Sequence, residues 1–130
     1  MLAPLSGLMQ SSFHRRFRLS AEDAAYIRRI GMEKLRAHAA DFIRQRLSPA
    51  YPVRDGHQTP MRGHPVFKAQ HACACCCRRC LHRWHGIPQG RELTPDEQSA
   101  VVALLLEWID SQTSPQPFSR RSPQQGMFDF

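Results

Sequence analysis

The residues best suited to chemistry lie between Asp55 and Glu92, a stretch in which the chain carries no acidic residue. This stretch holds all five cysteines and five of the seven histidines of the 130-residue chain. Thiolates and imidazoles are the ligands that soft and borderline metal ions prefer. The lack of carboxylates leaves the surroundings electropositive, which lowers the pKa of a thiol and favours the thiolate. The sequence therefore points to metal binding or thiol chemistry in this segment.

The metal interpretation rests on the spacing Cys77-x2-Cys80, followed by His85. Two thiolates one helical turn apart converge on a single ion, and zinc takes about four such ligands in a tetrahedral array. Either His71 or Cys76 would complete the set. An iron–sulfur cluster is an alternative because four thiolates are available, although all of them would come from one short segment.

A second interpretation is purely structural. If residues 65–84 form one helix, four cysteines fall on the same face of it, at positions 73, 76, 77 and 80. Cysteine packs as a small hydrophobe and is among the residue types most often buried. On this interpretation the protein is an interaction adaptor with packed structural cysteines.

A third interpretation is a metal- or Cys/His-dependent enzyme. A thiolate beside a histidine is an activated nucleophile. His64, Gln70 and His71 would line a pocket together with Arg62, and the basic group would favour a phosphorylated or otherwise anionic substrate. Histidines that converge with the thiols would favour zinc, whereas histidines that line a separate pocket would favour the enzyme.

A long run of residues resembles a known family. The chain reads H-Q-T-P-M-R-G-H-P-V-F over residues 57–67, A-Q-H-A over 69–72 and C-C-R over 76–78, and C-L, W-H and I-P follow. On these residues it resembles an uncharacterised bacterial domain-of-unknown-function family with the signature GHPVFxAQHAxAxCCRxCLxxWHxIPxG. The family has threonine where this chain has Cys73 and Cys75. The resemblance therefore narrows the candidate ligands to His64, His71, Cys76, Cys77, Cys80 and His85.

The charge of the chain suggests an anionic partner. The formal net charge is +7 and the isoelectric point is near 9.8, which favours nucleic acid. Arginine suits phosphate better than lysine does, because its planar guanidinium can donate two hydrogen bonds to one phosphate. The candidate phosphate contacts are Arg62, Arg78, Arg79 and Arg83.

The sequence also bears on location. The apolar run at the N-terminus is too short for a secretory signal, and it lacks the positive charges with which such a signal starts. No run approaches the roughly 18 apolar residues of a membrane-spanning helix. We therefore expect a cytoplasmic protein without membrane contact, in which free thiols are favoured over disulfides.

Helices must position these residues. Ser20 with Glu22 and Asp23 predicts a helix start and Gly31 its end, and a second helix is expected over 32–47. Pro65 opens the Cys/His-rich third helix, expected over 65–84. Thr94, Pro95 and Glu97 begin the last helix, whose apolar residues make it the central core element. No strand pattern occurs, so the expected fold is all-α, a small single domain of about four helices.

Three regions are expected along the chain: a flexible basic leader (1–18), a helical Cys/His-rich domain (19–112) and a disordered tail (113–130). The tail contains Gln124, Met127 and Phe128. Their spacing resembles the short peptide by which bacterial replication and repair proteins dock on the DNA polymerase sliding clamp. A few anchor side chains carry such binding.

The leading hypothesis is a small zinc-binding module that contacts nucleic acid. Its tail would recruit it to DNA replication or repair. Zinc would lie on Cys77, Cys80 and His85, with His71 or Cys76 as the fourth ligand.

Overall fold

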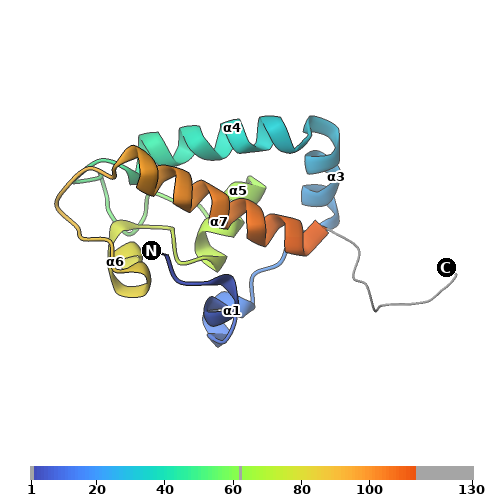
Figure 1. Cartoon of the computed structure of the whole chain (residues 1–130). Helices are drawn as coiled ribbons and strands as arrows, with labels where there is room; N and C mark the ends of the chain where they lie inside the picture. The colour runs from blue at the N-terminus through green and yellow to red at the C-terminus, as the bar shows by residue number, and fades with distance from the viewer. Residues whose placement is uncertain (1, 62, 114–130) are drawn as a thin grey trace, which may run out of the picture.

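The part of the chain that the computed structural model describes, residues 2–61 and 63–113, is built of helices and contains no β-strand (Figure 1). The predicted all-α class is confirmed. In chain order the elements are α1 (Leu5–Leu8), α2 (Ser12–Arg15), α3 (Ala21–Ile30), α4 (Met32–Phe42), the wide turn η1 (Ile43–Leu47), α5 (Pro65–Ala72), α6 (Arg78–His85) and α7 (Pro95–Thr113).

Two helix starts follow from local sequence. The Ser20 hydroxyl accepts a hydrogen bond from the Asp23 N–H, and the Asp23 carboxylate accepts one from the Ser20 N–H. Thr94 and Glu97 form the same reciprocal pair at the start of α7. Each pair satisfies two backbone donors that the first turn of a helix leaves free. The predicted starts of the first and last helices are confirmed.

The long helix α7 lies at the centre of the core. It packs against α4 on one side and α5 on the other, and it also contacts η1 and α1 (Figure 1). Its buried residues are Val101, Val102, Leu104, Leu105, Leu106, Trp108 and Ile109. Leu35 and Ala39 of α4 and Leu81 of α6 belong to the same core. None of the helices in the described part has the length and apolar character needed to cross a membrane.

The expected single helix over 65–84 is wrong. The chain forms two helices, α5 and α6, joined by a turn at residues 73–77. Ala74 adopts a left-handed backbone with φ of 58°, which a continuous helix does not allow. The Cys75 N–H bonds back to the carbonyl of Gln70, and Cys77 is extended and begins α6. The four cysteines therefore do not share one helical face.

The N-terminal leader is also different from the expectation of a flexible segment. Residues 2–18 carry α1 and α2, and both Leu8 and His14 are buried. The Ala3 N–H donates to Nδ1 of His85 at 2.9 Å. This apolar and hydrogen-bonded contact makes the leader part of the domain, because the buried groups would otherwise lose their partners.

Candidate metal centre

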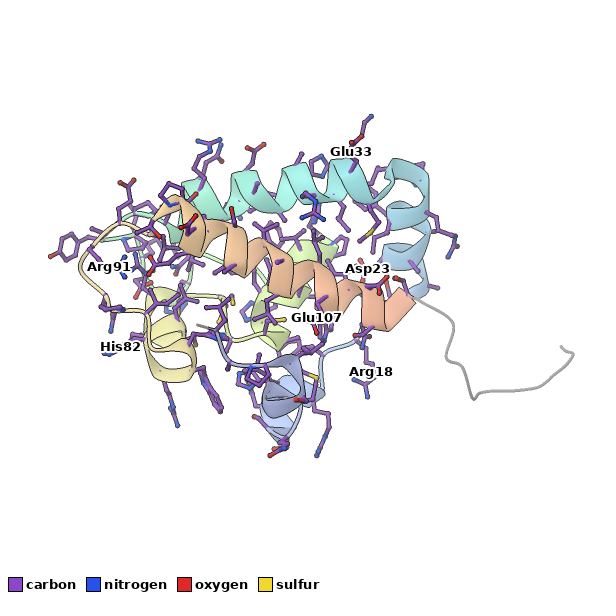
Figure 2. The ribbon with its side chains drawn as sticks, in the orientation of Figure 1. Arg18, Asp23, Glu33, His82, Arg91 and Glu107 are labelled. Atoms are coloured by element: carbon purple, nitrogen blue, oxygen red, sulfur yellow. The ribbon has the colours of Figure 1, made fainter. Side chains whose placement is uncertain are left out.

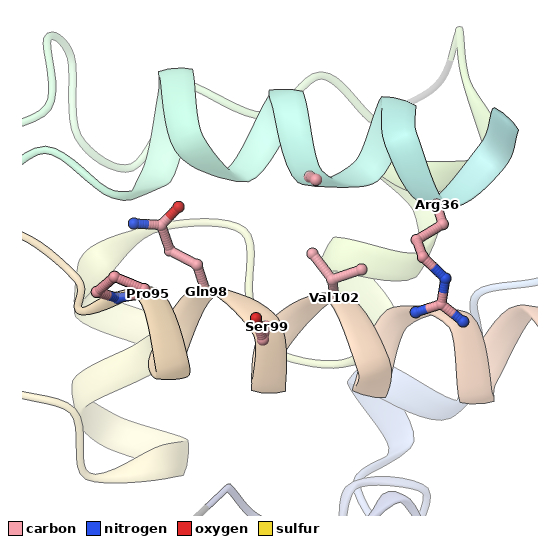
Figure 3. Close-up of a pocket in the computed structure, with 6 residues that line it drawn as sticks. Arg36, Pro95, Gln98, Ser99 and Val102 are labelled. Atoms are coloured by element: carbon pink, nitrogen blue, oxygen red, sulfur yellow. The ribbon is translucent and has the colours of Figure 1, made fainter. Parts of the chain in front are cut away.

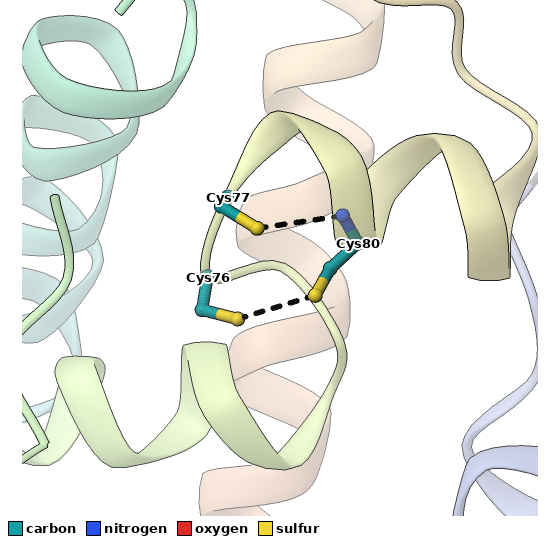
Figure 4. Close-up of side chains that lie close together, drawn as sticks. All are labelled: Cys76, Cys77 and Cys80. Atoms are coloured by element: carbon teal, nitrogen blue, oxygen red, sulfur yellow. Dashed lines mark hydrogen bonds between the residues drawn. The ribbon is translucent and has the colours of Figure 1, made fainter. Parts of the chain in front are cut away.

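Three cysteine sulfurs meet where the turn enters α6. Sγ atoms of Cys76, Cys77 and Cys80 all lie within 4.8 Å of one another. The Cys76 thiol donates to the Cys80 sulfur at 3.6 Å, and the Cys80 N–H donates to the Cys77 sulfur at 3.4 Å (Figure 4). Three soft donors at this separation can bind one metal ion.

The loop before α5 holds this turn in place. The Asp55 carboxylate accepts a hydrogen bond from the Arg78 N–H at 3.1 Å, in the first turn of α6. The Thr59 hydroxyl donates to the Cys76 carbonyl at 2.8 Å. The sulfur of Cys77 takes the capping position that an oxygen usually fills. Residues far apart in sequence thus fix the three sulfurs.

The surroundings make Cys77 the most acidic of the three thiols. The Cys76 and Cys80 thiols donate to its sulfur, and backbone N–H groups of α6 add to this, which lowers the pKa of Cys77. The pKa of Cys76 is raised because its thiol donates to Cys77 and to Cys80 and is buried. The hydrogen bond with Cys76 lowers the pKa of Cys80, but donation to Cys77 and burial outweigh it. Metal binding would release the protons that remain on these sulfurs.

His85 is not placed to join the three sulfurs as a metal ligand, which corrects the sequence expectation. Its Nδ1 accepts from the Ala3 N–H, and its Nε2 lies 2.8 Å from the Cys73 carbonyl. The first contact requires a lone pair and the second a proton, so both ring nitrogens of the neutral imidazole are used. Burial lowers the pKa of His85 and favours this neutral form. Its role is to tie the N-terminal segment to the turn.

His71 also lies apart from the three sulfurs. Its Nε2 contacts the carbonyl oxygens of Thr59 and Pro60 at 3.1 and 3.2 Å, and its ring stacks on Phe17. Among the described residues the group of candidate metal ligands contains no histidine. The site therefore offers three thiolates and leaves one coordination position to a donor from elsewhere.

Cys73 and Cys75 belong to the hydrophobic core. Both are fully buried, and burial raises the pKa of each thiol. The Cys73 thiol points to the Leu104 carbonyl at 3.8 Å. The structural interpretation thus holds for these two cysteines, whereas Cys76, Cys77 and Cys80 form a group that could hold a metal ion.

Arg78 is not available for a phosphate, which corrects a second expectation. Its side chain is only 1% exposed. The guanidinium donates to the carbonyls of Pro49 at 2.9 Å and Pro88 at 2.8 Å, and it also reaches Leu47 and Ser48. Arg79 and Arg83 are exposed on α6, and Arg62 lies outside the described residues. So do Gln124, Met127 and Phe128.

His64 lines a pocket of about 300 Å³ at the start of α5, away from the thiols, together with His38, Asp41, Phe42 and Gln45. Its Nδ1 accepts from the Val66 N–H and its Nε2 lies 3.3 Å from Nδ1 of His38. The described lining includes a carboxylate and neither lysine nor arginine, so it does not suit an anionic substrate.

Gln70 was expected in such a pocket but lies in the core. Its amide donates to the Thr59 hydroxyl at 3.3 Å and to the Cys75 carbonyl at 3.1 Å. These bonds join α5 to the loop before it and to the turn after it. Gln70 therefore holds the turn that carries the three clustered cysteines against α5 and the loop before it.

A second groove was not predicted. It runs between α4 and the start of α7 (Figure 3), holds about 330 Å³ and is lined by Arg36, Ala40, Pro95, Gln98, Ser99 and Val102. Small side chains at Ala40 and Ser99 keep the two helices from filling this space. The sequence spacing of the residues that line this groove does not distinguish them from ordinary helix residues.

The pocket histidine makes stability depend on pH. Burial, with repulsion from His38 added and Asp23 opposing, lowers the pKa of His64 to about 4. The unfolded chain, with a histidine pKa near 6.5, then binds a proton that the folded chain does not. The contribution of neutral His64 to the free energy of unfolding is therefore complete above about pH 6.5 and is lost as the pH falls toward 4.

In His64→Asn the amide oxygen can still cap α5, but the titrating group is gone. We expect the wild type to lose about 1–2 kcal/mol more stability than this variant between pH 7 and 4.5, since solvent screens a half-buried ring. Urea unfolding at both pH values, in the presence of chelator, measures the difference. Equal losses in the two proteins would contradict the assignment.

A family model described as "Domain of unknown function (DUF4186)" matches residues 3–110. The match includes α1, α2 and all three clustered cysteines. No solved structure matches the chain.

Proposed function

This chain belongs to the DUF4186 family, and we propose that it is a zinc-binding module that contacts nucleic acid. The zinc ion lies on Cys76, Cys77 and Cys80. The observation that carries the proposal is the convergence of these three sulfurs at the start of α6. Zinc suits the donors because thiolates bind it strongly and because an open fourth position is common in its reactive sites.

The fourth ligand in this proposal comes from outside the three-cysteine group. His85 and His71 are both engaged elsewhere. Water, or a donor atom from a bound partner, completes the tetrahedron. A site of this kind holds the turn between α5 and α6 in shape and keeps one position exchangeable.

Nucleic-acid contact is supported by the helix that the metal centre begins. α6 exposes Arg79 and Arg83, which are one turn apart, and His82 also points outward (Figure 2). The segment that contains α6 has no acidic residue. Recruitment through the tail residues Gln124, Met127 and Phe128 belongs to the same proposal on sequence grounds alone.

Zinc binding is tested by metal analysis of the purified full chain. We expect about one equivalent of zinc per chain, and Cys77→Ser and Cys80→Ser should each weaken zinc affinity by more than about 100-fold. The loss should exceed that seen when an outer-shell partner is removed, because a ligand itself is lost. Competition with a chromogenic chelator measures the affinity.

Cys73→Ser is the matched control, because the same atoms change outside the cluster and the hydroxyl can still donate to the Leu104 carbonyl. It should retain the zinc. A folded wild type that takes up no zinc from a stoichiometric solution, or cluster variants that bind it as tightly as the wild type, would refute the metal centre.

A further inference from the structure

Two stretches without acidic residues lie side by side on one surface. The first stretch is residues 1–21, since the first acidic residue of the chain is Glu22. The second stretch is residues 56–91. The first stretch forms α1 and α2, and the second forms α5 and α6. The His14 ring of α2 meets the Trp84 ring of α6 edge-on, with centroids 4.6 Å apart. Both helices lie on the side of the molecule opposite α4 (Figure 1).

This surface presents aromatic rings to solvent. Phe13 is 46% exposed and Trp84 is 36% exposed. The buried His14 lies between them, since its ring also packs edge-on against Phe13 at 5.3 Å. His14 thereby holds an exposed ring on each side at a defined position.

A cation accompanies each exposed ring. The Arg16 guanidinium lies over Phe13 with 4.5 Å to the ring centroid, and the Arg83 guanidinium lies 5.7 Å from a Trp84 ring centroid. We call Phe13, Arg16, Arg83 and Trp84 the α2–α6 patch. Both arginines have long flexible stems, so a guanidinium can exchange its ring for a phosphate without moving the helix.

We propose that the α2–α6 patch binds single-stranded nucleic acid, with bases stacked on Phe13 and Trp84 and phosphates on Arg16 and Arg83. The inference rests on the nucleic-acid part of the proposed function and names the surface and the form of the ligand. Base stacking on exposed rings within an electropositive surface is how single strands are bound without sequence preference. A duplex keeps its bases stacked on each other, so its base faces cannot reach these rings.

The test is fluorescence anisotropy of the full chain with a labelled single-stranded oligonucleotide and with the duplex of the same sequence. We expect the single strand to bind more tightly. Phe13→Ala and Trp84→Leu should each weaken its binding about tenfold, within the range for loss of one stacked base. Arg83→Gln should weaken binding and lower the slope of log affinity against log salt by about 0.7.

Tyr51→Ala is the matched control, because Tyr51 is an exposed aromatic residue (82%) outside the patch. It should leave the affinity unchanged, and thermal melts should show that every variant is folded. Equal binding of duplex and single strand that is insensitive to Phe13→Ala would overturn the inference but leave nucleic-acid contact in place.

Two other outcomes separate the inference from the proposed function. If neither nucleic acid binds at low salt while zinc is still taken up, the nucleic-acid part fails with the inference and the metal centre stands. If phosphatidylserine vesicles bind in a Phe13-dependent way and oligonucleotides do not, the patch is a membrane contact and the inference is wrong.

Discussion

Replacing Arg78 with methionine is expected to lower the free energy of unfolding by about 3–5 kcal/mol. The buried guanidinium donates to the carbonyls of Pro49 and Pro88, and the methionine would leave both without this partner. The Ser48 carbonyl would still accept a hydrogen bond from the Leu93 N–H, so losing the guanidinium costs less stability there than at Pro49 and Pro88. Because these bonds join α6 to the loops on either side, the same variant should also weaken zinc binding.

Urea unfolding followed by circular dichroism measures the effect. Arg79→Met is the matched control, because the neighbouring side chain is exposed. It should change stability by no more than about 0.5 kcal/mol. Arg78→Lys should fall between the two, because a single ammonium does not reach carbonyls on both sides as a guanidinium fork does. Equal stability of Arg78→Met and the wild type would show that the buried fork contributes nothing to the fold.

Removal of zinc is expected to lower the melting temperature by about 10–20 °C. At free zinc 1,000 times above the dissociation constant, an ion that binds only the folded chain adds about 4 kcal/mol. In a chain of this size each kcal/mol shifts the melting temperature by several degrees. The ion should act this strongly because it ties the turn to α6 at Cys76, Cys77 and Cys80, where three thiols otherwise share protons.

Melting curves with saturating zinc and with excess chelator measure the shift. Cys80→Ser should melt at nearly the same temperature in both conditions, whereas Cys73→Ser should keep most of the shift. A wild type whose melting temperature does not respond to the chelator would be inconsistent with zinc as a structural part of the fold.

The elements that the sequence predicted well are those that depend on neighbouring residues. Ser20 with Asp23 and Thr94 with Glu97 start α3 and α7 through bonds three residues apart. Such local patterns are complete in the sequence itself. The apolar content of α7 likewise indicated its central place, because only a core can cover so many apolar side chains.

The break between α5 and α6 was not predictable in the same way. The segment from Cys73 to Cys77 contains neither glycine nor proline, and Ala74 takes a left-handed conformation that its residue type does not favour. Distant bonds compensate for that cost. The Thr59 hydroxyl and the Asp55 carboxylate, both outside the segment, hold the Cys76 carbonyl and the first turn of α6.

By itself, the sequence determined the all-α class, the main helix starts and the stretch in which the chemistry lies. Only the tertiary structure decided that Cys76, Cys77 and Cys80 come together as a candidate metal site. It also decided that both ring nitrogens of His85 are engaged by Ala3 and Cys73, and that Arg78 is buried. The reason is physical. Helix starts depend on bonds between neighbours, whereas a ligand set depends on which donors are left over after distant segments have satisfied their own hydrogen bonds.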